Sequence, residues 1–253
     1  MNVMYQVMGI LHSKGLPLVF KGSMVLRALM EQKTELQTFR FTEDFDIDWV
    51  AELMSPEDFV QLFQEVMDGI DLGVYKVICT KEPINSTSGT FEIYRNGELE
   101  FSIDLSRKRN GWWVEYVTPD GVPFRGSSVN RILVDKLAVL SGEAILRRPQ
   151  DMYDLYVLSH VHDIGLLALK QTIFEVGRKF YDFSIFRSNS GMKTLEEAYD
   201  SVSYIINPPK FAPLYGRVHD FCMPFMLEPN AQDMEWIVSD QVWVERTQTN
   251  IGR

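Results

Sequence analysis

Three aspartates alternate with three large apolar side chains in the segment Asp44-Phe45-Asp46-Ile47-Asp48-Trp49. In a β-strand, this alternation places the carboxylates on one face and the apolar side chains on the other. The carboxylates repel one another unless a cation lies against them. Mg²⁺ would relieve the repulsion, because it takes one or two protein carboxylates together with substrate phosphates. A solvated edge strand explains the same pattern, and these residues alone leave both interpretations open.

A candidate phosphate-binding turn lies just upstream of the acidic segment. The apolar run Leu16–Phe20 predicts a buried strand, Lys21-Gly22-Ser23 follows it, and Met24–Met30 has apolar side chains at helical spacing. The N-terminus of a helix favours anions, because its backbone N–H groups and its dipole point at them, and Gly22 allows close approach. Ser is also an ordinary helix N-cap, so the acidic strand downstream is what makes this turn a candidate site.

Four short motifs follow one another along the chain. They are Phe20-Lys21-Gly22-Ser23 with Leu26-Arg27, then Arg40-Phe41-Thr42-Glu43-Asp44-Phe45-Asp46, then Asp135–Leu140, and then Arg148–Tyr156. As a set in this order they resemble the DNA polymerase β-type nucleotidyltransferase superfamily, and within it the AbiEii/AbiGii-type toxin family. The resemblance covers roughly residues 18 to 158.

The resemblance implies a nucleotidyltransferase that depends on Mg²⁺ (or Mn²⁺) and moves a nucleotide from an NTP to an acceptor. The acceptor would be an RNA, with the acceptor end of a tRNA as a candidate, or a protein. The expected metal ligands and catalytic acids are Asp44, Asp46 and Asp104, of which Asp104 takes this role from the resemblance alone. The expected NTP-binding residues are Lys21, Gly22, Ser23, Arg40 and Lys136.

Several of these residues have alternative interpretations. Asp48 is an acid beyond the pair of aspartates, Asp44 and Asp46, that the family motif contains, and the sequence leaves open which two of the three bind the metal. Arg40 either contacts phosphate or steadies the turn, or it forms an ion pair with Glu43. A lysine at position 136, among apolar residues of a predicted helix, is most often exposed at the surface. The resemblance instead implies that Lys136 contacts the triphosphate, whose charge an ammonium group neutralises.

The helix that is predicted to begin at Pro149 carries two further acids. Asp151 and Asp154 are three residues apart, so both can face one site. The resemblance implies that Asp154 is a catalytic residue, which positions a base, the acceptor or Lys136. An acid that interacts with the helix dipole is the alternative for Asp151. His160-Val161-His162-Asp163 is interpreted as a loop at the end of this helix, because nothing nearby in the sequence completes a metal site.

The predicted fold class is α+β: a nucleotidyltransferase-type mixed β-sheet flanked by helices over residues 1–126, then a mostly helical domain over 127–253 that contributes Lys136 and Asp154 to the site. Hairpins are expected at Asn96-Gly97 and Pro119-Asp120-Gly121. Ser55 and Ser128 are predicted to cap helices. Further helices are predicted over 1–14, over 166–180, from Thr194 to Pro208 and over 231–246.

The net charge of −10 argues against a protein that coats nucleic acid. It leaves room for RNA at a local basic patch, for which Arg107-Lys108-Arg109 is the candidate; a solvated surface turn is the alternative. The chain shows no signal peptide and no membrane-length apolar run. Its two cysteines, Cys79 and Cys222, predict reduced thiols in a cytoplasmic protein.

The family resemblance also predicts a biological setting. The chain would be the toxin of a bacterial toxin–antitoxin or abortive infection system, and a cognate antitoxin would be a possible partner. The alternative is a module with the same fold that binds a nucleotide or a partner without turnover.

Overall fold

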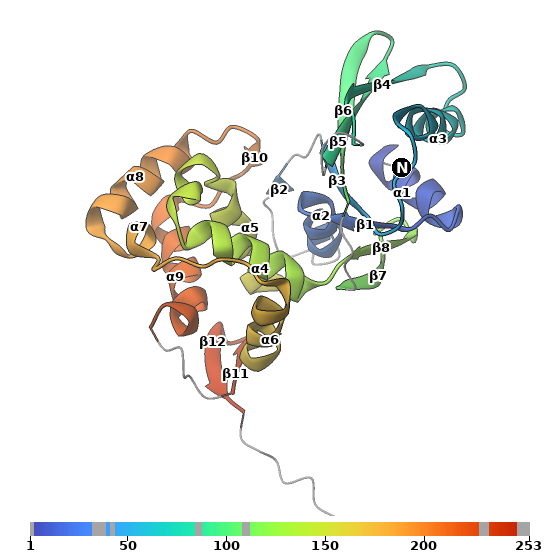
Figure 1. The fold of residues 1–253 in the computed structure, drawn as a ribbon. Coiled ribbons are helices and arrows are strands. Elements are labelled where there is room, and N and C mark those ends of the chain that lie inside the picture. The colour runs from blue at the N-terminus through green and yellow to red at the C-terminus, as the bar shows by residue number, and fades with distance from the viewer. Residues whose placement is uncertain are drawn as a thin grey trace, which may run out of the picture. The chain divides into compact units, whose positions relative to one another are not determined.

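The computed structural model describes residues 3–31, 39–40, 44–83, 88–107, 112–227 and 233–246. The chain forms two compact units (Figure 1). The first unit takes in Met1–Glu35 and Arg40–Ser128, and the second takes in Leu36–Phe39 and Val129–Arg253. In the part of the chain that the structure describes, we find no helix that is long and apolar enough to cross a membrane.

The first unit contains a mixed β-sheet. Its strands are β1 (Leu18–Lys21), β3 (Asp44–Trp49), β4 (Tyr75–Lys81), β5 (Ser88–Arg95), β6 (Glu98–Arg107), β7 (Trp113–Val117) and β8 (Pro123–Ser127). They lie in the order β4-β5-β6-β3-β1-β8-β7. Strand β3 pairs antiparallel with β1 and parallel with β6, and β1 pairs parallel with β8. The helices among the described residues of this unit are α1 (Val3–Ser13), α2 (Ser23–Glu31) and α3 (Pro56–Asp68).

The apolar face of β3 lies in the core of this unit. The rings of Phe45 and Phe101 are 5.3 Å apart, and Trp49 packs edge-on against Phe59 of α3 at 5.0 Å. Helix α3 begins as the sequence predicts, because the Ser55 side chain accepts a hydrogen bond from the Asp58 backbone N–H at 3.1 Å. Helices α1 and α3 lie on the same side of the sheet (Figure 1). The aspartates of β3 therefore face the opposite side.

The second unit is mostly helical, which confirms the prediction. Its helices are α4 (Val129–Leu140), the 3-10 helix η1 (Glu143–Arg147), α5 (Gln150–Val161), α6 (Leu166–Val176), α7 (Ser184–Arg187), α8 (Asn189–Asp200) and α9 (Phe211–Leu227). Strands β9 (Ile164–Gly165), β11 (Met234–Ile237) and β12 (Val242–Glu245) form a small sheet. Strand β2 (Phe39–Arg40) pairs with β10 (Ile205–Ile206). Helix α5 ends at Val161. The predicted loop over His160–Asp163 is therefore wrong for His160 and Val161, which lie in the last turn of the helix, and the helix ends just before His162.

The predicted helix over residues 231–246 is wrong. The described residues of this segment form an antiparallel hairpin of β11 and β12. Gln241 in its turn adopts a positive φ of 58°. The hairpin is fixed by packing: Trp236 is fully buried, and its ring lies 5.1 Å from that of Phe221 and 5.7 Å from that of Trp243. Aromatic and β-branched residues favour such a pleated surface.

The predicted helix from Thr194 to Pro208 is also wrong in its bounds. Helix α8 begins earlier, because the Ser188 side chain accepts a hydrogen bond from the Gly191 backbone N–H at 3.0 Å and caps it. Thr194 lies inside the helix and donates to the Ser190 carbonyl. The helix ends at Asp200, well before Pro208.

Candidate active site

A row of polar side chains crosses the face of the sheet that carries the aspartates of β3. The strand register places Thr90, Asp104, Asp46 and Lys21 opposite one another on β5, β6, β3 and β1. Asp46 and Asp104 are direct neighbours on two parallel strands. The Thr90 hydroxyl donates a hydrogen bond to Asp104 Oδ1 at 2.8 Å. The site therefore has two facing carboxylates, one of which is oriented by a hydroxyl group.

The third acid of the predicted metal site, Asp44, lies one position further along the same face of β3. It is opposite Ser102, whose hydroxyl donates to Asp44 Oδ1 at 2.5 Å. Asp44 and Asp104 are exposed and Asp46 is half-buried. The structure thus brings all three predicted carboxylates onto one polar face of two neighbouring strands.

Gly22 brings the start of α2 against this face. Its φ is +64°, in the left-handed region, and a Cβ atom built on it would lie 2.7 Å from Asp46 Oδ2. The Gly22 carbonyl accepts from the Leu26 backbone N–H, which begins the helix. Ser23 is the first helical residue. The anion-favouring helix N-terminus and the Asp46 carboxylate are therefore adjacent, as a site for a metal-bound phosphate requires.

We expect Gly22→Ala to weaken the binding of Mg²⁺ and NTP at this site by more than the backbone strain of the substitution alone explains. A non-glycine residue in the left-handed region costs about 1–2 kcal/mol, and here the new methyl group also displaces the Asp46 carboxylate. Gly121→Ala is the matched control, because Gly121 has a φ of +80° and nothing within 4 Å of its Cβ position. Urea unfolding should show a loss in both variants, whereas calorimetry with Mg²⁺ and an NTP analogue should show weakened binding in Gly22→Ala only. Equal binding by the two variants would contradict the assignment.

The third acid of strand β3, Asp48, is already paired. Lys21 Nζ lies 2.7 Å from Asp48 Oδ1 and donates to the Ser106 hydroxyl at 2.9 Å. Asp48 is buried, with 6% of its surface exposed. This pair gives Asp48 a structural role and distinguishes it from Asp44 and Asp46. The same pair holds the Lys21 side chain next to Asp46, its cross-strand neighbour on β3. A contact of Lys21 with an NTP stays a prediction.

We expect Asp48→Asn to lower metal affinity without touching the metal. Once Asp48 is neutral, the Lys21 ammonium group should turn to Asp46, its cross-strand neighbour on β3, and compete with a cation. The expected loss is about tenfold in the affinity for Mg²⁺ with an NTP analogue, or about 1.4 kcal/mol. The double variant Lys21→Met/Asp48→Asn should regain that affinity. Calorimetry that shows wild-type affinity in Asp48→Asn would disprove the competition.

The donor set fits a magnesium ion that is shared with a substrate. Among the described residues, no group of three His, Cys, Asp or Glu side chains is arranged to hold a metal ion. Asp46 and Asp104 instead offer two hard oxygen donors beside a phosphate-favouring helix start. Mg²⁺ commonly takes one or two carboxylates and completes its shell with water and substrate phosphate.

The second unit holds a buried charge network around Lys136. Its Nζ lies 2.5 Å from Asp151 Oδ1 and 2.6 Å from Asp154 Oδ2. Arg148 Nε approaches Asp151 Oδ2 at 2.9 Å. Burial acts to lower the pKa of Lys136, but the nearby charges of Asp154 and Asp151 outweigh it and the pKa is raised. The lysine is therefore a fixed positive charge.

This network overturns one interpretation of the sequence. Lys136 is 6% exposed, so a surface lysine is excluded. Asp151 and Asp154 both face Lys136, and the implied pairing of Asp154 with Lys136 is present. A contact of Lys136 with the triphosphate stays a prediction.

Some site residues are found by structure and not by sequence. Ser102 and Ser106 alternate with Asp104 on β6, so the period of two could have pointed to them, but their partners depend on the register. The Arg107 side chain approaches Glu52 at 3.1 Å, and the rest of the predicted basic patch, Lys108 and Arg109, lies outside the described residues. Arg40 lies in β2; its alternative partner Glu43 is also outside them.

Comparison with known proteins gives the family. The family model of the nucleotidyl transferase AbiEii toxins of type IV toxin–antitoxin systems matches residues 8–211. Among solved structures, the chain is similar to MenT4, a nucleotidyltransferase toxin from Mycobacterium tuberculosis H37Rv, with a TM-score of 0.55 and 16% identity over 90% of this chain and 82% of that chain. At this identity the similarity shows the fold.

The polyadenylate synthase of Megavirus aligns with a TM-score of 0.31 and 12% identity over 83% of this chain and 38% of that chain. No curated protein matches the chain. The family match spans most of the sequence, including the Gly-Ser turn, the acidic strand and the Lys136 network, and the chain therefore belongs to the AbiEii nucleotidyltransferase toxins.

Proposed function

We propose that this nucleotidyltransferase uses Mg²⁺ (or Mn²⁺) to transfer a nucleotide from an NTP to RNA, with the acceptor end of tRNA as the first candidate. The observation that carries the proposal is the arrangement around Asp46. This carboxylate faces Asp104 on the neighbouring parallel strand and lies against Gly22 at the start of α2. A cation at the two acids and a phosphate at the helix start would then be neighbours.

The roles of the first unit follow from this arrangement. Asp46 and Asp104, with Asp44 beside them, would hold the metal, and Gly22 and Ser23 would bind the triphosphate through backbone N–H groups and the hydroxyl. The bound metal would stabilise the negative charge that develops on the attacking and leaving oxygens. The acceptor hydroxyl oxygen forms a bond to the α-phosphorus, the bond to pyrophosphate breaks, and the hydroxyl loses its proton.

The roles of Lys136 and Asp154 in the reaction are a separate part of the proposal. The burial of Lys136 between two carboxylates supports a lysine that is held in one orientation and one charge state. Such an ammonium group could neutralise triphosphate charge. Asp154 would position Lys136.

The acceptor and the partner rest on family membership. RNA is proposed in preference to protein, with Arg107-Lys108-Arg109 as its candidate contact. A type IV toxin–antitoxin family implies a cognate antitoxin, and we propose that one exists for this chain.

Incubation with each labelled NTP, Mg²⁺ and total RNA, followed by a denaturing gel, tests the acceptor. We expect one NTP to label a narrow RNA band in the size range of tRNA. If only a protein band carries the label, RNA is not the acceptor, and the protein is a nucleotidyltransferase with a protein acceptor. The triple change of Arg107, Lys108 and Arg109 to Ala should reduce RNA labelling and flatten its salt dependence, because each lost phosphate contact lowers the salt slope by about one unit.

A further inference from the structure

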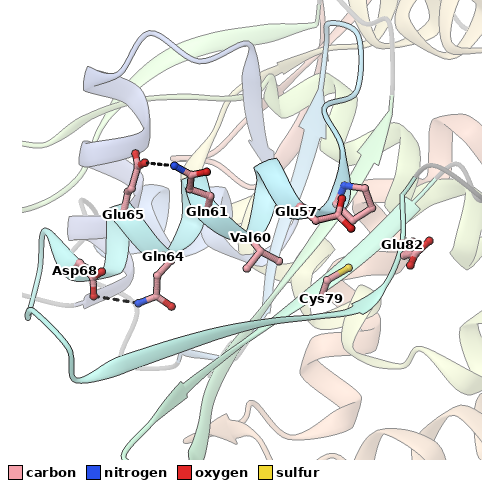
Figure 2. Close-up of a pocket in the computed structure, with 9 residues that line it drawn as sticks. Glu57, Val60, Gln61, Gln64, Glu65, Asp68, Cys79 and Glu82 are labelled. Carbon is pink, nitrogen blue, oxygen red and sulfur yellow. Dashed lines mark hydrogen bonds between the residues drawn. The ribbon is translucent and has the colours of Figure 1, made fainter.

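A groove in the first unit lies away from the acidic face of the sheet, between α3 and the edge strand β4. Its volume is about 490 Å³. Figure 2 shows Val60 and Gln64 pointing from α3 toward β4. Cys79 and Glu82 lie close to Glu57, at the end of the groove where α3 begins. None of these residues takes part in the proposed reaction, so the groove needs an explanation of its own.

The backbone of β4 borders this groove at the edge of the sheet. Strand β4 is the last strand on its side, and no strand pairs with its outer edge in the described part of the chain. The Gln64 side chain bonds to that edge like a neighbouring strand: its oxygen accepts from the Val77 N–H at 3.0 Å, and its nitrogen donates to the Tyr75 carbonyl at 2.9 Å.

The contacts of Gln64 fix which backbone groups face outward. Residues of an edge strand point their N–H and C=O groups alternately to the paired strand and to the outside. Because Val77 faces outward and the register with β5 is regular from Val77 to Cys79, the backbone of Cys79 faces outward as well. Cys79 also lines the groove. An extended peptide in the groove could therefore continue the sheet from the point where Gln64 stops.

The charge of the groove selects the peptide. Four carboxylates and no lysine or arginine occur among the residues that line it. Glu65 is partly neutralised by Lys14 at 3.6 Å, and Asp68 accepts from Gln64. Glu57 and Glu82 lie at the opposite end of the groove, beside Cys79. There, burial and then the charges of Glu82 and Glu57 raise the pKa of the Cys79 thiol.

We propose that this groove is a docking surface for an extended, basic segment of another protein, which pairs with the outer edge of β4 beside Cys79 and places a lysine or arginine against Glu57 and Glu82. The open edge supplies backbone hydrogen bonds, and the acids supply charge complementarity. The proposed docking does not depend on the proposed nucleotidyl transfer, so an experiment can disprove either proposal without affecting the other.

Alkylation of Cys79 by iodoacetamide, read by mass spectrometry on the full chain, tests the proposal. Cys222 is fully buried and serves as an internal reference. A short peptide that alternates lysine and valine, at ten times its dissociation constant, should slow alkylation of Cys79 about tenfold. The same design with glutamate for lysine should not protect, and neither should one with proline for valine, because proline has no N–H to pair with the edge.

Variants of the protein complete the test. The double variant Glu57→Gln/Glu82→Gln should bind the lysine peptide with about fivefold lower affinity, which is the effect of losing two exposed ion pairs. Asp120→Asn, at an exposed turn elsewhere, should bind it with unchanged affinity. The comparison uses each variant's own rate without peptide, because the two glutamates also affect the thiol. No protection of Cys79, equal protection by the proline peptide, or undiminished binding to the double variant would overturn the proposal. So would equal protection by spermidine, which would indicate a small-cation site.

Discussion

The double variant Asp46→Asn/Asp104→Asn is expected to lose nucleotidyl transfer by about three orders of magnitude or more, because several kcal/mol of charge stabilisation disappear with the metal. The fold should remain. Asp104 is exposed and Asp46 half-buried, and asparagine keeps the oxygen that accepts from Thr90. Removal of facing carboxylates also relieves repulsion. Single-turnover rates and a thermal melt measure the two effects.

The matched control for this variant is Glu92→Gln. Glu92 lies opposite Ser102 on β5, and accepts a hydrogen bond from Tyr94 at 2.6 Å. Glu92→Gln removes a carboxylate near the site without changing a proposed metal ligand, so nucleotidyl transfer should stay near the wild-type rate. A similar loss of rate in Glu92→Gln would show that general surface charge, rather than the two facing acids, matters. A large fall in melting temperature for the double variant would make Asp46 and Asp104 structural.

Lys136→Met is expected to destabilise the protein by roughly 3–5 kcal/mol, the cost of removing one partner from a buried ion pair. Asp154 and Asp151 would remain buried without the ammonium group, although Arg148 would still compensate Asp151. The raised pKa of Lys136 means that its contribution is fully present below 10.5 and is lost only as the pH rises through the raised value. Urea unfolding should therefore show the same loss across the neutral and mildly alkaline range.

A second variant separates charge imbalance from lost packing. Lys136→Met/Asp154→Asn removes both charges, so much of the stability should return, because neutral groups of similar volume often replace a buried pair at little cost. If Lys136→Met unfolds like the wild type, the network is not buried as the structure has it. If the double variant is stable but does not transfer nucleotides, Lys136 or Asp154 acts in the reaction as well as in the fold.

The local patterns in the sequence predict much of the first unit. The alternation over Asp44–Trp49 gives the two faces of β3, and Gly22 with Ser23 gives the turn before α2. The sequence does not predict the cross-strand partners of these residues, because three aspartates share one face of the strand. Only the structure shows that Lys21 forms an ion pair with Asp48 and that Asp46 lies next to Asp104. The burial of Lys136 is not predicted from the sequence either, because its partners Asp151 and Asp154 lie on another helix.

The second unit was predicted less well, because tertiary contacts override local propensity there. Helix α9 begins with Phe211-Ala212-Pro213 and contains Pro224. Proline fits the first turn of a helix but ordinarily interrupts its interior, so local propensity does not predict a helix over these residues. The hairpin of β11 and β12 depends on Phe221, which packs against Trp236 and Trp243. A local pattern does not contain that information.

The most direct test of nucleotidyl transfer compares two positions of the label in the same NTP. With Mg²⁺, wild-type protein should move an α-phosphate label to the acceptor and release an equal amount of pyrophosphate, whereas a γ-phosphate label should leave with the pyrophosphate. Asp46→Asn/Asp104→Asn should do neither, and Glu92→Gln should do both. Transfer of the γ label to the acceptor, or transfer of the α label at the wild-type rate by the double variant, would contradict the account.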